Sequence, residues 1–258
     1  MLEKIDLSKK LPKNQYQEEM LRLERRLFDL EKACWDAGIP SVIVFEGWDA
    51  SGKGSTINAL TQHLEPRGFR LYPIRAPRTH EQHLPWLWRF WTKLPNYGQM
   101  AIFDRSWYGR VLVERVEKKI PPKLWRRAFQ DISEFEHAIT DDGYVILKFF
   151  LHISKKEQAK RFCKLESDPL ESWHVQKEDW EHHRRYDEYL EAVEAMLERT
   201  ESEWASWTVV EATDRRWTRH KVFSTIVGRL EQTLAARGKP LAPAPPAAKS
   251  RPRRNSRA

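Results

Sequence analysis

The amino-acid sequence predicts an α/β fold in which a mainly parallel β-sheet lies between layers of helices. Short apolar runs with strand character alternate with longer segments of helical periodicity along most of the chain. The strand-like runs are apolar at consecutive positions, which is typical of strands buried on both faces of a parallel sheet. A glycine-bracketed loop follows the first run and precedes a helical segment, as phosphate-binding loops do.

The predicted elements begin with an amphipathic helix over 15–36, whose apolar face carries Met20, Leu23, Leu27, Leu30 and Cys34. Strands are predicted over 41–46, 69–74, 99–104, 144–153 and 207–211. Helices are predicted over 53–64, 81–93, 109–118, 124–140, 154 to about 166, and 178–199, and a last helix carries Phe223, Ile226, Leu230 and Leu234. Ser154 and Glu157 have the spacing of a capping box.

At 258 residues the chain is long enough for one substantial core. We divide it into an N-terminal extension (1–13), one α/β domain (14–236) and a basic tail (237–258). From Gly238 to Ala258 the chain holds six Lys and Arg residues and no acids, so this segment leaves a net charge of +2 (+8 minus +6) for the rest of the chain. Its proline content predicts disorder. It either contacts a polyanion or is simply solvated, and we expect no nucleic-acid partner.

Cysteine content and hydropathy indicate the compartment. Cys34 and Cys163 have neither metal-ligand spacing nor a disulfide framework around them. No apolar run approaches the length of a membrane span, and the N-terminus lacks the order of a signal peptide. We therefore expect a cytoplasmic protein with no membrane partner.

The loop after the first strand, Gly47-Trp48-Asp49-Ala50-Ser51-Gly52-Lys53-Gly54, predicts a phosphate site. Its backbone N–H groups and its lysine suit phosphate oxygens. The usual loop has a hydroxyl directly after the lysine as a magnesium ligand, but here Gly54 follows and Ser55 comes one residue later. Asp49 is the candidate substitute, because a carboxylate suits a hard cation. The alternative is that Asp49 only caps a turn.

A second carboxylate ends the predicted strand Gln99–Asp104. Asp104 occupies the position from which many P-loop proteins present a carboxylate to magnesium. Arg105 and Arg110 follow within six residues, and their planar guanidinium groups match phosphate oxygens. The alternative is a structural pair between Asp104 and Arg105.

Together with the loop, the segments Leu64-Glu65-Pro66-Arg67-Gly68 and Phe103-Asp104-Arg105-Ser106-Trp107-Tyr108 resemble the polyphosphate kinase 2 family, from about Tyr16 to Leu234. The resemblance implies a P-loop kinase-like three-layer sandwich with a helical lid. It also implies phosphoryl transfer between inorganic polyphosphate and a nucleotide with Mg²⁺, for which Mn²⁺ is a possible substitute. The implied partners are adenine or guanine nucleotides and further copies of the chain, as a dimer or a tetramer.

The resemblance also implies roles for individual residues. Metal-binding residues are Asp49 and Asp104, and catalytic residues are these two with Lys53, Arg105 and Arg110. Phosphate- or nucleotide-binding residues are Gly47, Gly52, Lys53, Gly54, Ser55, Arg67, Arg161 and Lys164. The lid spans about 160–177, where Arg161 and Lys164 share one helix face; the alternative is a solvated basic face. At position 174 many members have Lys, whereas this chain has His174.

Two alternative functions stay open at this point. One is an ATP-dependent nucleoside monophosphate kinase, which shares the core and differs in the donor. The other is a non-catalytic sensor of nucleotides or polyanions. The sequence leaves open whether AMP or ADP is the acceptor. It offers no histidine for general base catalysis, and we expect most histidines, including His182 and His183, to lie on the surface.

Overall fold

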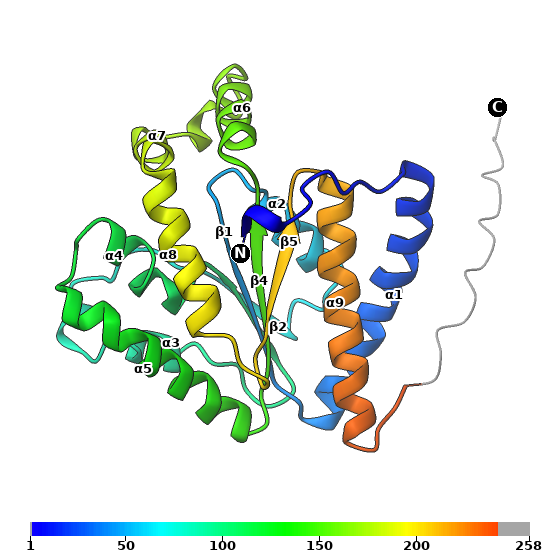
Figure 1. Cartoon of the computed structure of the whole chain (residues 1–258). Helices are drawn as coiled ribbons and strands as arrows, with labels where there is room; N and C mark the ends of the chain where they lie inside the picture. Colours follow the sequence, from blue (N-terminus) through cyan, green and yellow to red (C-terminus); the bar gives the residue numbers. More distant parts are fainter. Residues whose placement is uncertain (1, 242–258) are drawn as a thin grey trace, which may run out of the picture.

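Five parallel strands form one sheet in the order β2-β3-β1-β4-β5, as the computed structural model of residues 2–241 places them (Figure 1). Their bounds are β1 Ser41–Gly47, β2 Phe69–Pro73, β3 Met100–Asp104, β4 Val145–His152 and β5 Trp207–Glu211. The predicted parallel sheet and its five strands are therefore confirmed, with ends that differ by at most one residue.

Helices cover both faces of the sheet, which completes the predicted three layers (Figure 1). Helices α1 (Lys13–Ala37), α2 (Lys53–Thr61) and α9 (Arg215–Ala236) lie on one side. The other side carries α3 (Trp88–Trp91), α4 (Val113–Val116), α5 (Pro122–Asp141) and α8 (Tyr186–Arg199). Helices α6 (Lys155–Glu166) and α7 (Lys177–Arg184) project beyond the carboxyl end of β4, where a lid would lie.

Strand β1 lies in the middle of the sheet and at the centre of the core. Val42, Ile43, Val44 and Phe45 are fully buried because helices cover both faces of this strand. The strand pairs with β3 on one side and with β4 on the other, so its register places Phe45 beside Asp104. The carboxyl ends of β1 and β3 therefore meet at one edge of the sheet, where α/β proteins bind ligands.

A buried ion pair lies under the segment that follows β3. Lys148 of β4 and Glu136 of α5 are 2.8 Å apart, and their side chains are 0% and 1% exposed. Lys148 also donates to the Thr200 carbonyl, while Glu136 accepts from the Tyr108 hydroxyl and the Trp107 indole. Both charges are thus compensated, as burial requires. The network fixes Trp107 and Tyr108, three and four residues after Asp104.

The predicted helix over 81–93 is wrong in extent. The structure has a 3-10 turn at Glu81–His83 and only four α-helical residues, Trp88–Trp91. Between them Leu84 is extended, with φ −119° and ψ 159°. Pro85 explains the break, because a proline disfavours the helical conformation of the residue before it.

Two further helices are shorter than predicted. The segment 109–118 contains a 3-10 turn, Trp107–Arg110, and the short helix α4. Ser106 begins that turn early by accepting the N–H of Tyr108. The segment 178–199 is two helices, α7 and α8, separated at Arg185, whose guanidinium donates to the Val116 carbonyl on α4.

The capping box predicted at the start of α6 is half formed. Ser154 accepts the N–H of Glu157 at 3.2 Å. The Glu157 carboxylate instead accepts from Arg161, 2.9 Å away. The competing arginine lies one helical turn further on, where it reaches the same carboxylate.

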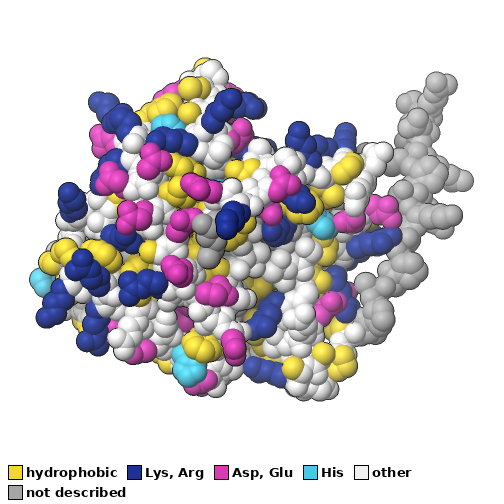
Figure 2. All heavy atoms as spheres, in the orientation of Figure 1, with side chains coloured by type: hydrophobic (Ala, Val, Ile, Leu, Met, Phe, Trp, Pro, Cys, Tyr) yellow, Lys and Arg dark blue, Asp and Glu magenta, His cyan; other side chains and the backbone are white. Residues whose placement is uncertain are grey.

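The chain ends differ in how much the structure describes. Leu2 and Leu11 are buried, and the Leu2 amide donates to Glu194, so the N-terminal extension is anchored at these positions while most of its residues are exposed. At the other end α9 stops at Ala236, one residue before the predicted tail, and residues 242–258 of that tail lie outside the described part. In Figure 2 basic and acidic side chains alternate over the visible face. No helix within residues 2–241 has the length and apolarity needed to cross a bilayer.

Candidate active site

The loop between β1 and α2 has the backbone conformation that its glycines allow. Gly52 has φ +99° and precedes the first helical residue, Lys53. Gly47 has φ +145°, and a Cβ atom there would lie 2.5 Å from the Leu151 carbonyl oxygen. Glycine at position 47 is therefore required both by conformation and by the close approach of β4.

The Lys53 side chain lies under this loop and is hydrogen-bonded to it. Its Nζ donates to the carbonyls of Gly47 at 2.7 Å and of Trp48 at 2.9 Å. The side chain is only 9% exposed. Burial lowers the pKa of Lys53, and the charges of Asp49 and Asp104 oppose that shift. The ammonium group is thus placed under the loop, among the residues that were predicted to bind phosphate.

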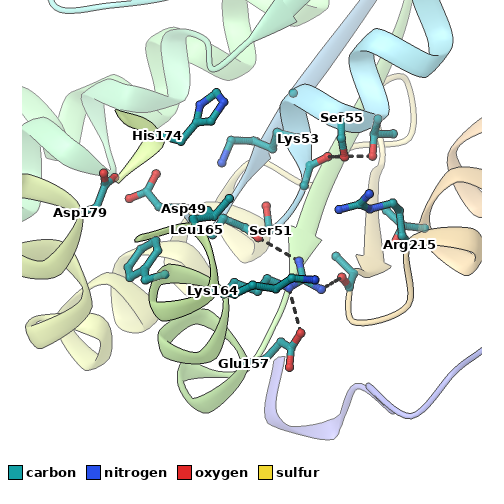
Figure 3. Close-up of a pocket in the computed structure, with 18 of the residues that line it drawn as sticks. Asp49, Ser51, Lys53, Ser55, Glu157, Lys164, Leu165, His174, Asp179 and Arg215 are labelled. Atoms are coloured by element: carbon teal, nitrogen blue, oxygen red, sulfur yellow. Dashed lines mark hydrogen bonds and ion pairs between the residues drawn. The ribbon is translucent and has the colours of Figure 1, made fainter. Parts of the chain in front are cut away.

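A cavity of about 910 Å³ opens above the loop. It is lined by the loop itself, the end of β3, helix α6 and the start of α9. Figure 3 places Asp49 and Asp179 at one side of Lys53, and Ser55 and Arg215 at the other. The predicted site residues among its lining are Asp49, Gly52, Lys53, Gly54, Ser55, Asp104, Arg105, Arg161 and Lys164. Residues far apart in the sequence are therefore brought to one hollow.

Asp49 lies at the centre of a charged cluster. Its Oδ1 accepts from Arg105 at 2.7 Å, and its Oδ2 lies 3.1 Å from His182 Nδ1. Burial opposes ionisation of this carboxyl group, but the hydrogen bond with His182 and the charges of Arg105 and Lys53 outweigh it. Together they hold the pKa of Asp49 well below its ordinary value. Asp49 is therefore ionised throughout the neutral range.

Arg105 reaches Asp49 from a strained backbone position. It directly follows β3 and has φ +61°, a left-handed conformation that costs a non-glycine residue energy. The next residue, Ser106, donates from its hydroxyl to Glu46 Oε1 at 2.8 Å. Burial raises the pKa of Glu46 to about 7. The Ser106–Glu46 bond ties the segment after β3 to β1 and so holds Arg105 in this conformation.

Asp49 and Asp104 fit a divalent cation by their chemistry. Both carboxylates line the same cavity beside the phosphate loop, and both offer oxygen, the donor that hard cations prefer. Within residues 2–241 no group of three or more His, Cys, Asp or Glu side chains has the arrangement of a protein-only metal site. Two carboxylates fit a metal ion that takes its remaining ligands from water and phosphate.

Arg161 on α6 faces the loop and is heavily hydrogen-bonded. Its guanidinium donates to the carbonyls of Ala50 at 2.9 Å, Ala212 at 2.7 Å and Thr213 at 3.0 Å, as well as to Glu157. It thereby joins α6 to the phosphate loop and to the segment after β5. Lys164, three residues on, is exposed and lines the cavity. The phosphate-binding role of both residues stays a prediction.

Three predicted site residues do not line the cavity. Arg67 is 85% exposed and pairs with Glu65, and Arg110 pairs with Glu114 while its guanidinium stacks over the Trp86 ring. Gly47 contributes its carbonyl to Lys53 from below the loop.

The expectation that His182 and His183 are surface residues is wrong. The His182 side chain is 22% exposed and lies between two carboxylates, those of Asp49 and Glu117. His183 Nδ1 lies 2.7 Å from Gln158, which in turn donates to the Asp49 carbonyl. The charged composition of this helix gives no sign of these contacts, because they depend on how α7 folds back over the loop.

Comparison with known proteins agrees with this geometry. The model of the family described as polyphosphate kinase 2 matches residues 10–238. Two relatives, from Pseudomonas syringae pv. tomato and Pseudomonas aeruginosa, are named polyphosphate:AMP phosphotransferase. They are 41% and 42% identical over 91% and 90% of this chain. The chain spans about half of their length, 47% in each case.

A solved structure extends the comparison to the fold. The polyphosphate kinase 2 of Arthrobacter aurescens TC1 superimposes with a TM-score of 0.88 at 26% identity, covering 95% of this chain and 88% of that one. The family match covers nearly the whole described domain, including the loop after β1, Asp104 and helices α6 and α7. The chain therefore belongs to the polyphosphate kinase 2 family.

Proposed function

We propose that this protein is a polyphosphate-dependent nucleotide kinase with AMP as its first acceptor and ADP as the second. The observation that carries the proposal is the meeting of Lys53, Asp49 and Asp104 in one cavity. The relatives named polyphosphate:AMP phosphotransferase support the choice of AMP. In the reaction a phosphate oxygen of AMP forms a P–O bond to the terminal phosphorus of polyphosphate. The bridging P–O bond breaks, giving ADP and a chain one phosphate shorter.

The residues of the cavity would act on charge and alignment. Negative charge on the transferred group spreads over its oxygens, so fixed cations stabilise it. Lys53 is positioned for this by its two loop carbonyls, and Arg105 by Asp49. Arg110, the other arginine in our catalytic assignment, would have to leave Glu114 to join them. The acceptor is already an anion, so a strong general base is not required.

We further propose that Asp49 and Asp104 hold Mg²⁺, with Mn²⁺ as a substitute. When bound, the ion would neutralise phosphate charge between donor and acceptor. Asp49 is ionised and therefore ready to bind it without losing a proton. Removal of divalent cations with EDTA is expected to stop turnover, and added Mg²⁺ or Mn²⁺ to restore it.

The lid, about 160–177, would close over the donor. Lys160 and Lys164 line the cavity on α6, and Arg215 lines it at the start of α9. A polyphosphate chain carries about one negative charge per phosphate, so it needs cations along its length. These three side chains offer such cations outward from the loop, together with the glycine N–H groups of the loop itself.

The deciding experiment is a product assay with no added ATP. Polyphosphate is supplied with AMP, ADP, GMP or GDP in parallel, and nucleotide products are separated by chromatography. ADP formation from AMP supports the proposal, whereas turnover only with ATP as donor indicates an ATP-dependent monophosphate kinase. Asp104→Asn is expected to abolish transfer. A protein that binds polyphosphate but never turns over, with or without this substitution, would be a sensor.

We also propose a cytoplasmic homo-oligomer, a dimer or a tetramer. Within the described residues Cys34 and Cys163 are both free thiols, and Cys163 is exposed, which suits a reducing compartment. Light scattering coupled to size exclusion would give the number of copies, and a monomer would refute this part of the proposal.

A further inference from the structure

One imidazole joins three separate parts of the molecule. His182 lies on α7, Asp49 in the phosphate loop, and Glu117 at the end of α4. His182 Nδ1 is 3.1 Å from Asp49 Oδ2, and its Nε2 is 2.9 Å from Glu117 Oε1. The three side chains are between 16% and 22% exposed, so water has limited access to these bonds.

Glu117, which contacts His182 on the side away from Asp49, is itself held in place by other residues. Glu117 also accepts from the Tyr189 hydroxyl at 3.2 Å and pairs with Lys119 at 2.5 Å. The Tyr189 ring packs against the imidazole, with centroids 5.2 Å apart. Glu117 therefore offers His182 a firm anchor, and the imidazole orientation is set from the side opposite Asp49.

On the other side of His182, the Asp49 carboxylate is oriented by two neighbouring side chains. Arg105 donates to one carboxylate oxygen, and His182 approaches the other. An ionised carboxylate only accepts hydrogen bonds, so the donor in the contact with Asp49 is the Nδ1–H of His182. With both oxygens held, the plane of the carboxylate cannot rotate, and one lone pair of each oxygen is left for other partners.

We propose that His182 is a positioning residue that sets the orientation of Asp49 for a divalent cation only while α7 is closed over the phosphate loop. The proposal rests on the metal-binding role proposed above for Asp49. It links α7 to the Asp49 carboxylate through a single hydrogen bond: when α7 moves away, the carboxylate loses the donor on Oδ2 and keeps only Arg105.

Two neutral substitutions separate the two bonds of the imidazole. The side-chain amide nitrogen of asparagine reaches the place of a histidine Nδ1, and that of glutamine reaches the place of Nε2. His182→Asn therefore keeps a donor toward Asp49 and loses Glu117, whereas His182→Gln keeps a donor toward Glu117 and loses Asp49. Both variants carry the same neutral amide, so their difference reports orientation and no difference in charge. His137→Asn, an exposed histidine on α5, is the matched control.

The first readout is Mn²⁺ binding to the full chain without substrates, measured by electron paramagnetic resonance. We expect His182→Gln to bind Mn²⁺ about 10-fold more weakly than His182→Asn, the lower end of what loss of an outer-shell partner costs. The second readout is amide hydrogen exchange of α7, which we expect to be faster in His182→Gln than in His182→Asn. His137→Asn should match the unsubstituted protein in both.

Two failures are distinguishable. Equal Mn²⁺ affinities for the asparagine and glutamine variants, or tighter binding by the glutamine variant, overturn the positioning role of His182 alone. If the unsubstituted protein does not bind Mn²⁺, or if Asp49→Asn binds it equally well, the metal-binding role of Asp49 fails and the inference fails with it.

Discussion

Replacing Lys148 with methionine should destabilise the protein by removing one half of its buried ion pair. The Lys148 ammonium lies 2.8 Å from Glu136 and 2.8 Å from the Thr200 carbonyl, with the side chain fully buried. Methionine fills much of the same volume but leaves the Glu136 carboxylate without its counter-charge. Breaking a pair of this kind costs about 3–5 kcal/mol. At about 2–4 °C per kcal/mol for a domain of this size, the midpoint of thermal unfolding should fall by about 6–20 °C.

The measurement is thermal and urea unfolding followed by circular dichroism, with Glu134→Gln as the control. Glu134 is exposed on the same helix, α5, so its substitution should change stability by less than about 0.5 kcal/mol. The double variant Lys148→Met with Glu136→Gln removes both charges and should recover part of the loss. A single Lys148→Met variant as stable as the control would refute the argument, as would a double variant less stable than Lys148→Met.

The pH dependence gives an independent check on the same variant. Burial already raises the pKa of Glu136, and Lys148 is the main group that opposes that shift. Without Lys148 the folded protein holds a proton on Glu136 that the unfolded chain releases as pH rises. The loss of stability should therefore be small near pH 4 and should grow toward neutral pH. A loss that is independent of pH would show that the missing charge is not its cause.

Three further predictions concern the site. Gly47→Ala should cost about 1–3 kcal/mol in unfolding free energy, because its Cβ would lie 2.5 Å from the Leu151 carbonyl; an unchanged unfolding midpoint would contradict this. Lys53→Met should lower kcat by about 10²–10³-fold, and a smaller effect in steady-state assays would place the catalytic charge elsewhere. Burial raises the pKa of Glu46 to about 7 from 4.5, so this group should lower the stability of the protein as pH rises from 4.5 to 7; Glu46→Gln should make the fall in pH-dependent melting curves shallower, while Glu31, whose pKa burial also raises to about 7, still contributes.

Local sequence patterns were enough to predict the sheet and the phosphate loop. Consecutive apolar residues such as Val42 to Phe45 can only be buried on both sides, and glycines bracketing a lysine after a strand leave few other conformations. The placement of Asp104 at the same edge of the sheet as the loop also follows, because parallel strands align their carboxyl ends, but that β3 lies next to β1 was seen only in the structure. For the same reason Asp49 and Asp104 could be assigned to one site before any contact was known.

Local patterns failed where a helix ends without a local cause. Pro85 is a local cause for the break before α3, whereas the break at Arg185 accompanies a hydrogen bond to a carbonyl of α4, which is distant in the sequence. The partner of Lys148 was equally hidden. The lysine stands within an apolar run that predicts burial, but Glu136 lies on another element and nothing in its local sequence indicates the pairing.

Residues that are neighbours in the chain were enough to predict the parallel strands, the glycine-bracketed loop and a carboxylate at the end of each of two strands. Which charges surround Asp49 depends on packing between distant elements. Arg105, His182 and Glu117 come from the segment after β3, from α7 and from α4, and they meet because these elements pack over one edge of the sheet. The fold also bonds Arg161 to three carbonyls and leaves Arg67 in solvent, which no spacing in the sequence encodes.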